Sequence, residues 1–213
     1  MRVRNVHQRL LPGPPERVGA LIDELGGPAD RLWPSDRWPA IRLDRPLRSG
    51  AEGRHGSIRY RVEAYQPGRR VTFRFTGMPG VDGGHRLEAE PAGPGAVVLR
   101  HTMEIRVGAR MLVTWPLFLR SLHDAMLEDL LDRAELAVTG SVARPARWPA
   151  RVRLVRGGSA RLRRLRRRLR SRRARSALSG RGGPGYGAGP APARGTGTGS
   201  RSPAGGPGGR GYW

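Results

Sequence analysis

The chain has 213 residues, no cysteine and a formal net charge of +23 at pH 7. Residues 1–141 carry 21 arginines and all 17 acidic residues, a net charge of +4, whereas residues 142–213 carry 19 arginines and no acidic residue. The lack of cysteine excludes disulfides, thiolate metal sites and cysteine nucleophiles. The high pI, which would ordinarily indicate a nucleic-acid-binding protein, therefore describes the last third of the chain.

Composition divides the chain into three segments. Residues 1–141 hold nearly all aliphatic and aromatic side chains and are expected to form one domain. Residues 142–178 are arginine-rich, and residues 179–213 are rich in Gly, Pro and Ser, so burial cannot offset the entropy of ordering them and we expect disorder. No apolar stretch approaches the ~20 residues of a membrane span, and the first residues lack a signal-peptide core. The expected location is the cytoplasm, with peripheral membrane attachment as an option.

Apolar periodicity gives the first elements in chain order. Residues 2–10 are expected to form a strand. A helix is expected over residues 14–25, because two prolines stand in its first turn and apolar residues recur at i, i+3, i+4 and i+7. Two glycines end it. We expect a second short helix at residues 28–32 and a brief strand at residues 41–43.

Period-2 patterns dominate the middle of the chain. Apolar and polar residues alternate over 58–64, 71–75, 85–89 and 97–105, with Gly and Pro between the runs. Four consecutive strands with one apolar face each predict an antiparallel meander. The glycine-rich stretch 50–56 is expected to be a flexible loop that could gate a cavity.

From about residue 109 to residue 138 the period becomes helical. The apolar stripe consists of Leu112, Trp115, Leu119, Leu122, Met126 and Leu130. Pro116 either starts this helix or kinks it. The order of elements predicts an α+β fold in which an antiparallel sheet of six or seven strands wraps around one long C-terminal helix.

Particular stretches carry a family resemblance. They are PPERVGALI, WPAIRLDRPLRSGAEGRHGSIRYRVEAYQPGRRVTFRF, GGHRLEAEP, LRHTMEIRV and WPLFLRSLHDAMLEDLLDRAE. Over residues 2–139 the chain resembles the SRPBCC helix-grip superfamily, which includes START, pollen-allergen-like and polyketide cyclase/dehydratase domains. Within it, the chain is most similar to the bacterial polyketide cyclase-like branch. The resemblance implies a cavity between sheet and helix that takes a lipid or a polyketide-like aromatic molecule, and it implies no particular reaction.

Inward-facing side chains are the candidates for this cavity. They are Ile58, Tyr60, Val62, Val71, Phe73, Phe75, His85, Leu87, Leu99, His101, Met103, Trp115, Leu119, Leu122 and His123. Such residues also build ordinary cores, so the structural and the ligand-binding interpretations overlap. The leading hypothesis is that the protein binds a small hydrophobic or aromatic molecule without chemistry of its own.

Histidines offer the alternative of an enzyme. His85 and His101 fall on the inward faces of strands joined by one hairpin, where directly opposed Cβ atoms lie ~5 Å apart. They could exchange protons with a ligand carbonyl or phenol, as a cyclase or dehydratase requires, or each could satisfy a local backbone group. His123 on the helix has the same two interpretations. No HExxH or other ligand spacing supports a metal site, and we expect no metal and no cofactor.

Charged residues at the end of the domain have simpler interpretations. Asp124, Glu128, Asp129 and Asp132 are expected to form a solvated helix face, in which Asp124 could orient a histidine.

The arginine-rich segment suggests a third function, non-specific docking on an anionic membrane or on nucleic acid. Its leucines fall on one side of a possible helix, although compositional bias explains the run equally well. The candidate arginines are Arg161, Arg163, Arg164, Arg166, Arg167, Arg168, Arg170, Arg172 and Arg173.

Overall fold

The computed structural model describes residues 1–108, 115 and 119–157. All of them belong to the first of two units of the chain, Met1–Arg163. The expectations for Leu112 and Pro116, for the arginines at positions 161–173 and for the segment 179–213 lie outside the described residues.

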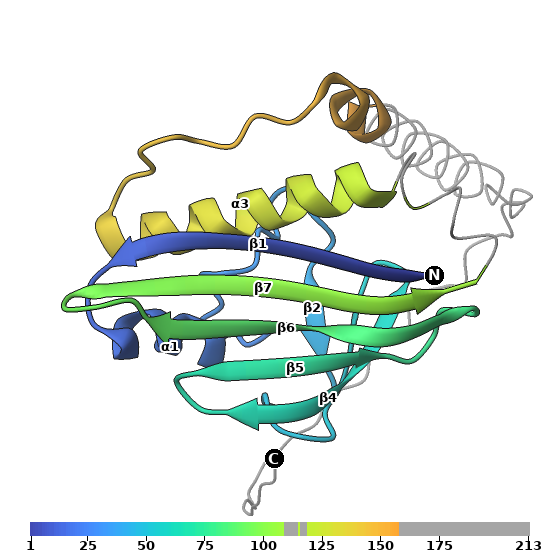
Figure 1. The fold of residues 1–213 in the computed structure, drawn as a ribbon, viewed down its shortest axis with the longest axis horizontal. Helices are drawn as coiled ribbons and strands as arrows, with labels where there is room; N and C mark the ends of the chain where they lie inside the picture. Colours follow the sequence, from blue (N-terminus) through green and yellow to red (C-terminus); the bar gives the residue numbers. More distant parts are fainter. Residues whose placement is uncertain (109–114, 116–118, 158–213) are drawn as a thin grey trace, which may run out of the picture. The chain divides into compact units, whose positions relative to one another are not determined.

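Seven antiparallel strands form one sheet in the order β1-β7-β6-β5-β4-β3-β2 (Figure 1). The strands are β1 (Arg2–Pro12), β2 (Ile41–Leu43), β3 (Glu52–His55), β4 (Ile58–Gln66), β5 (Arg70–Phe75), β6 (Val81–Pro91) and β7 (Ala96–Val107). From β2 to β7 each strand pairs with the next one along the chain, and β1 pairs with β7. The predicted meander and the α+β class are confirmed.

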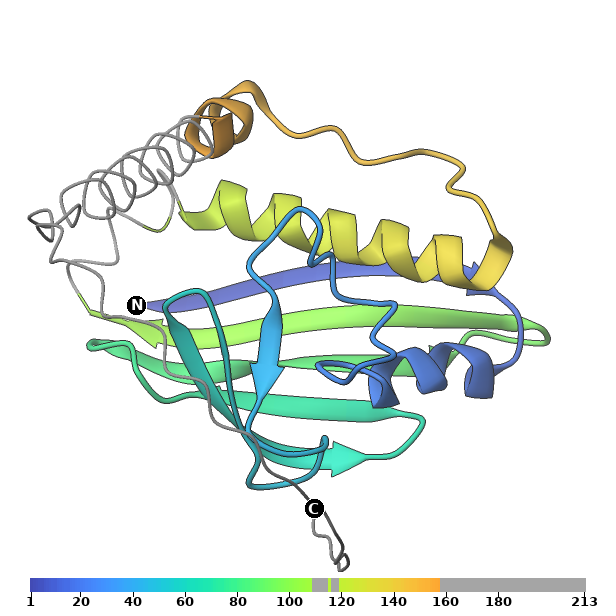
Figure 2. The ribbon, with the colours of Figure 1, turned by 180° about the vertical axis from the view of Figure 1, so that it is seen from behind.

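Two helices pack on the sheet, α1 (Pro15–Asp23) and α3 (Arg120–Thr139). Figure 2 shows both on the same face, and the main core combines their apolar side chains with those of the strands. Helix α1 comes close to the β4–β5 turn because Gly19 has no side chain: a Cβ there would lie 2.0 Å from the carbonyl oxygen of Gly68. Helix α3 ends at Gly140, whose φ of 80° favours glycine.

The second short helix expected at residues 28–32 is absent, because turns and bends occupy this stretch. The carboxylate of Asp30 accepts hydrogen bonds from the backbone amides of Gly26, Leu32 and Trp33 at 2.8–2.9 Å. These bonds stabilise a turn instead of a helix, since aspartate competes well for nearby backbone donors.

The flexible loop expected at residues 50–56 is also corrected, because Glu52–His55 form β3 between β2 and β4. Gly53 makes the pairing possible: a Cβ at this position would lie 2.4 Å from the ring of Tyr60. The sheet therefore holds most of this stretch, and the interpretation as a gate is wrong for it.

A β-bulge changes the far end of β4. The β4–β5 register shifts between Val62 and Ala64, and Ala64, predicted to face inward, is exposed. Tyr65 packs against the core instead, and its hydroxyl donates to Asp23 Oδ1 at 2.8 Å.

After Gly140 the chain runs back along α3, and residues 150–157 are helical (Figure 1). We call residues 142–157 the strap. Val152 of the strap is 1 % exposed and lies in the main core, and Trp148 packs against that core. The core thus extends past residue 141, where the charge distribution suggests that the domain ends.

Candidate functional site

Two connected hollows lie between the sheet and α3. The inner cavity has a volume of about 50 Å³ and the outer pocket of about 430 Å³. Both have a mainly apolar lining, and they share the side chains of His55, Ile58, Phe75, His123 and Met126. The outer pocket falls within the size range of small-molecule sites.

Most of the predicted cavity residues line one of the two hollows. The inner cavity is lined by Ile58, Tyr60, Phe73, Phe75, His85, Leu87, His101 and His123. The outer pocket adds Met103, Trp115, Leu119 and Leu122. Val62, Val71 and Leu99 are buried in the core but line neither hollow, because alternation along a strand identifies the inward face and not the part of it that borders the cavity.

All five histidine rings and the ring of Tyr60 form a continuous series of neighbours. The distances between successive ring centroids are 5.6 Å for His55–Tyr60, 5.8 Å for Tyr60–His85, 5.1 Å for His85–His101, 5.4 Å for His101–His123 and 6.4 Å for His123–His7. We call these six residues the imidazole array. It runs from the inner cavity to the edge of the domain at β1.

His85 and His101 form the centre of the array. They are diagonal neighbours, since His85 pairs with Met103 and His101 pairs with Leu87. The sequence suggested that the two histidines are directly opposed, and this prediction is wrong. Their rings nevertheless meet, with 3.1 Å between His101 Nε2 and His85 Nδ1. One ring donates and the other accepts, and the tautomer decides which.

Burial keeps the inner imidazoles neutral. Desolvation lowers the pKa of His55 to about 4, and it lowers the pKa of His123 to about 4 against the opposing charge of Asp124. Desolvation together with the neighbouring histidines lowers the pKa of His85 to about 3 and also lowers the pKa of His101. Each ring therefore presents one donor and one acceptor at neutral pH.

Several polar atoms of the array are buried without a hydrogen-bond partner among the described residues. They are Tyr60 Oη, His55 Nδ1, His101 Nδ1 and His123 Nδ1. All four residues line the inner cavity. A buried polar group without a partner costs about 1–3 kcal/mol, and such groups are rare in native proteins unless water or a ligand satisfies them.

His7, at the outer end of the array, has the opposite charge state. Its Nδ1 lies 2.7 Å from Glu128 Oε1 and its Nε2 lies 3.1 Å from Asp124 Oδ1. Burial alone lowers the pKa of His7, but the hydrogen bonds and charges of these two carboxylates outweigh it and raise the pKa to about 9. His7 is therefore an imidazolium at neutral pH, and Asp124 does orient a histidine.

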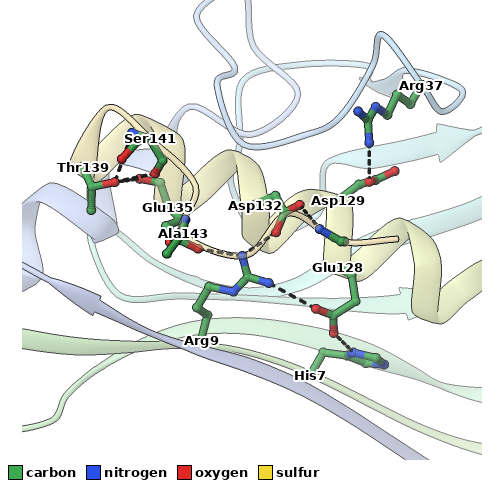
Figure 3. A network of polar contacts seen from close by, with 11 residues as sticks. His7, Arg9, Arg37, Glu128, Asp129, Asp132, Glu135, Thr139, Ser141 and Ala143 are labelled. Carbon is green, nitrogen blue, oxygen red and sulfur yellow. Dashed lines mark hydrogen bonds and ion pairs between the residues drawn. The ribbon is translucent and has the colours of Figure 1, made fainter. Parts of the chain in front are cut away.

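The acidic residues of α3 are not a solvated face, which corrects the expectation from the sequence. Figure 3 shows Arg9 of β1 directed at Glu128, Asp132 and Glu135, and all three carboxylates pair with it. These contacts fix β1 to the helix.

The same helix face holds the strap. Asp129 is 2 % exposed and accepts hydrogen bonds from Arg37 Nη1 at 2.8 Å, Trp38 Nε1 at 2.7 Å and Trp148 Nε1 at 2.9 Å. One and two turns further along α3, backbone amides of the strap donate to Asp132 and Glu135. This anchoring places Val155 and Arg156 in the wall of the outer pocket.

Comparison with known proteins identifies the family. The model of the family described as polyketide cyclase / dehydrase and lipid transport matches residues 2–135. The chain belongs to this family. The resemblance drawn from the sequence is thereby confirmed. No curated protein matches the chain significantly.

Solved structures resemble this polyketide cyclase / dehydrase family member at low identity. Norcoclaurine synthase from Thalictrum flavum is 11% identical, with a TM-score of 0.52, over 65% of this chain and 94% of that one. CalU16 from Micromonospora echinospora is 18% identical, with a TM-score of 0.48, over 73% and 84%. A START superfamily protein from Mycobacterium smegmatis is 13% identical, with a TM-score of 0.48, over 64% and 97%. The likeness to norcoclaurine synthase shows the shared fold alone.

Some residues of the site in this family member were missed from the sequence. His55 lies between two glycines in a stretch that alternation does not mark as a strand, although its ring contacts both Trp33 and Tyr60. Trp38, Val155 and Arg156 were missed because loops and the strap bring them to the pocket. Trp148, Val152 and Val155 recur at i, i+4 and i+7, and this short apolar pattern is a sequence signal that the strap packs on the domain.

The described part of the chain contains no group of three His, Asp or Glu side chains arranged to hold a metal ion. In the same residues, no helix combines the length and apolarity that crossing a membrane requires.

Proposed function

We propose that this protein binds a small aromatic molecule, largely apolar but bearing a hydroxyl or carbonyl oxygen, in the inner cavity and outer pocket. The observation that carries the proposal is the set of four buried polar atoms without partners on Tyr60, His55, His101 and His123, in walls that are otherwise apolar. An oxygen substituent of a ligand can satisfy these atoms, whereas a pure hydrocarbon leaves them unpaired.

The electrostatics of the array support a neutral ligand. The lowered pKa values of the inner histidines leave no cation among the described residues of the inner cavity to pair with a carboxylate, and burying an unpaired charge is costly. In the wall of the outer pocket, the guanidinium of Arg156 lies over the Trp38 ring. The cation at His7 is already paired with Asp124 and Glu128. A phenol or an aromatic ketone suits this environment better than an acid.

Calorimetric titration with 1-naphthol and with naphthalene tests the proposal. We expect one molecule of 1-naphthol to bind per chain, about tenfold more tightly than naphthalene, because the hydroxyl pairs with the array. His101→Phe keeps the volume and aromaticity of the site but removes a polar partner, so the preference should shrink. Equal affinity for the two compounds, or binding of neither, would contradict the proposal.

A second candidate function is proton transfer on the bound molecule. The hydrogen bond between His85 and His101, both neutral and both lining the inner cavity, favours it. A neutral imidazole can take a proton from the carbon next to a ligand carbonyl and return one to the same position, with no other reactant.

Deuterium incorporation into 1-tetralone in heavy water tests this second candidate. Catalysis predicts exchange at the carbon beside the carbonyl at least about a hundredfold faster than in buffer, and slower exchange in His85→Phe and His101→Phe. If 1-tetralone is bound but exchanges at the buffer rate, the protein binds the molecule without transferring its protons, and the second candidate function is wrong.

A further inference from the structure

The mouth of the outer pocket carries exposed apolar side chains. Leu154 is 79 % exposed, Val155 44 % and Leu119 39 %. Val155 and Leu119 line the outer pocket, and Leu154 is the neighbour of Val155 in the strap helix. Two separate segments, the start of α3 and the strap, therefore present large apolar side chains to solvent around one opening.

The strap that bears these residues is strongly cationic. It contains five arginines and no acidic residue. Arg144, Arg147, Arg151 and Arg153 are exposed, and none of the four forms an ion pair with another described residue. The described carboxylates beneath the strap pair with other cations: Asp129 with Arg37, and Asp132 and Glu135 with Arg9.

We propose that the strap and the mouth of the outer pocket form a docking surface for an anionic lipid bilayer, on which the pocket opens. Exposed arginines pair with anionic headgroups, while leucine and valine side chains enter the boundary of the acyl chains. Nucleic acid would satisfy the arginines but would leave the apolar side chains in water. The strap carries both exposed arginines and exposed apolar side chains, and Val155 of the strap lines the outer pocket, so the combination favours the lipid surface.

The anchoring of the strap makes this surface rigid. The hydrogen bond between Trp148 and Asp129 and the burial of Val152 hold the strap helix on the domain. Leu154 can therefore enter a bilayer without unfolding of the strap, which lowers the entropic cost of docking. This inference goes beyond the proposed function, and its test needs no ligand in the cavity.

A single fluorescent label on the full chain tests the inference. Because the chain has no cysteine, Leu154→Cys provides one attachment site for an environment-sensitive nitrobenzoxadiazole dye. Leu10→Cys is the matched control, since Leu10 is 63 % exposed but lies on β1 beside the fully buried Leu11, whose side chain takes the opposite direction. With vesicles of 30 mol % phosphatidylserine in phosphatidylcholine, we expect the dye at position 154 to shift to the blue and at least about double in intensity, and the dye at position 10 to stay unchanged.

Charge removal and a second polyanion complete the test. Replacing Arg151→Gln and Arg153→Gln together should weaken vesicle binding about tenfold, because each arginine near an anionic surface contributes a factor of about five before screening.

Three results would overturn the inference: no binding to the vesicles, bound protein in which the dye at position 154 remains in water, or the same dye response to duplex DNA. The second result would assign docking to the arginines at positions 161–173, and the third would assign the surface to nucleic acid.

Discussion

His7 differs from the other four histidines in the direction of its pKa shift, although all five rings belong to the imidazole array. Its two ring nitrogens contact carboxylates of α3, which raise its pKa to about 9. The inner rings have no acidic hydrogen-bond partner among the residues that the structure describes, and burial lowers their pKa values. One side-chain type thus supplies both a fixed cation that ties β1 to α3 and neutral groups that face the cavity.

The raised pKa of His7 predicts how stability depends on pH. The folded-state pKa of about 9 lies above the unfolded value of about 6.5, so the stabilisation is fully present below pH 6.5 and is lost as the pH rises through 9. We expect the urea-derived free energy of unfolding of the wild type to decrease between pH 6.5 and 9. In His7→Gln this decrease should be largely absent. Parallel pH profiles of the two proteins would show that His7 does not carry the effect.

The strap is the element that sequence patterns describe least well. Its helical apolar pattern is limited to Trp148, Val152 and Val155, and hydrogen bonds to carboxylates of α3, which sequence periodicity does not reveal, also hold it. The rings of Trp148 and Trp38 are tilted by 58° with 5.4 Å between their centroids, and the guanidinium of Arg156 lies 4.4 Å from the centroid of the Trp38 ring. These contacts make the strap part of the pocket wall.

Loss of the Trp148 ring should release this element. We expect Trp148→Ala to lower the free energy of unfolding by about 3 kcal/mol and to speed tryptic cleavage after Arg147. Leu154→Ala is the control, because a side chain that is 79 % exposed contributes little to folding. If both variants resist trypsin as the wild type does, the strap is held by other contacts.

The strands and α3 could be predicted because their burial patterns are periodic in sequence. Strand β3 could not, since Gly53 within it weakens the intrinsic preference for a strand, and pairing with β2 and β4 decides its conformation. The bulge in β4 likewise depends on β5.

The candidate site was predictable in part for the same reason. Alternation places His85 and His101 on the inward face, but their diagonal contact depends on strand register. The burial of Asp129 depends on Trp38, which lies 91 residues away in sequence, and nothing local signals it.

At the scale of the whole domain, the sheet, α3 and the strap enclose a polar array within an apolar cavity. Sheet and helix supply the imidazoles, and the strap completes the wall of the outer pocket. The proposed aromatic molecule with an oxygen substituent would meet these hydrogen-bonding groups in the inner cavity. Occupancy of this interior by such a molecule is the central claim.

Calorimetric titration of two tryptophan variants with 1-naphthol tests this claim most directly. Ile58→Trp fills space that borders both hollows, whereas Val98→Trp adds the same ring at a half-buried position that lines neither. Because a filled cavity cannot admit the ligand, we expect Ile58→Trp to bind 1-naphthol at least about tenfold more weakly than the wild type. Val98→Trp should bind one equivalent, as the wild type does. Undiminished binding by a folded Ile58→Trp variant would contradict the account, because the molecule would then bind outside the cavity.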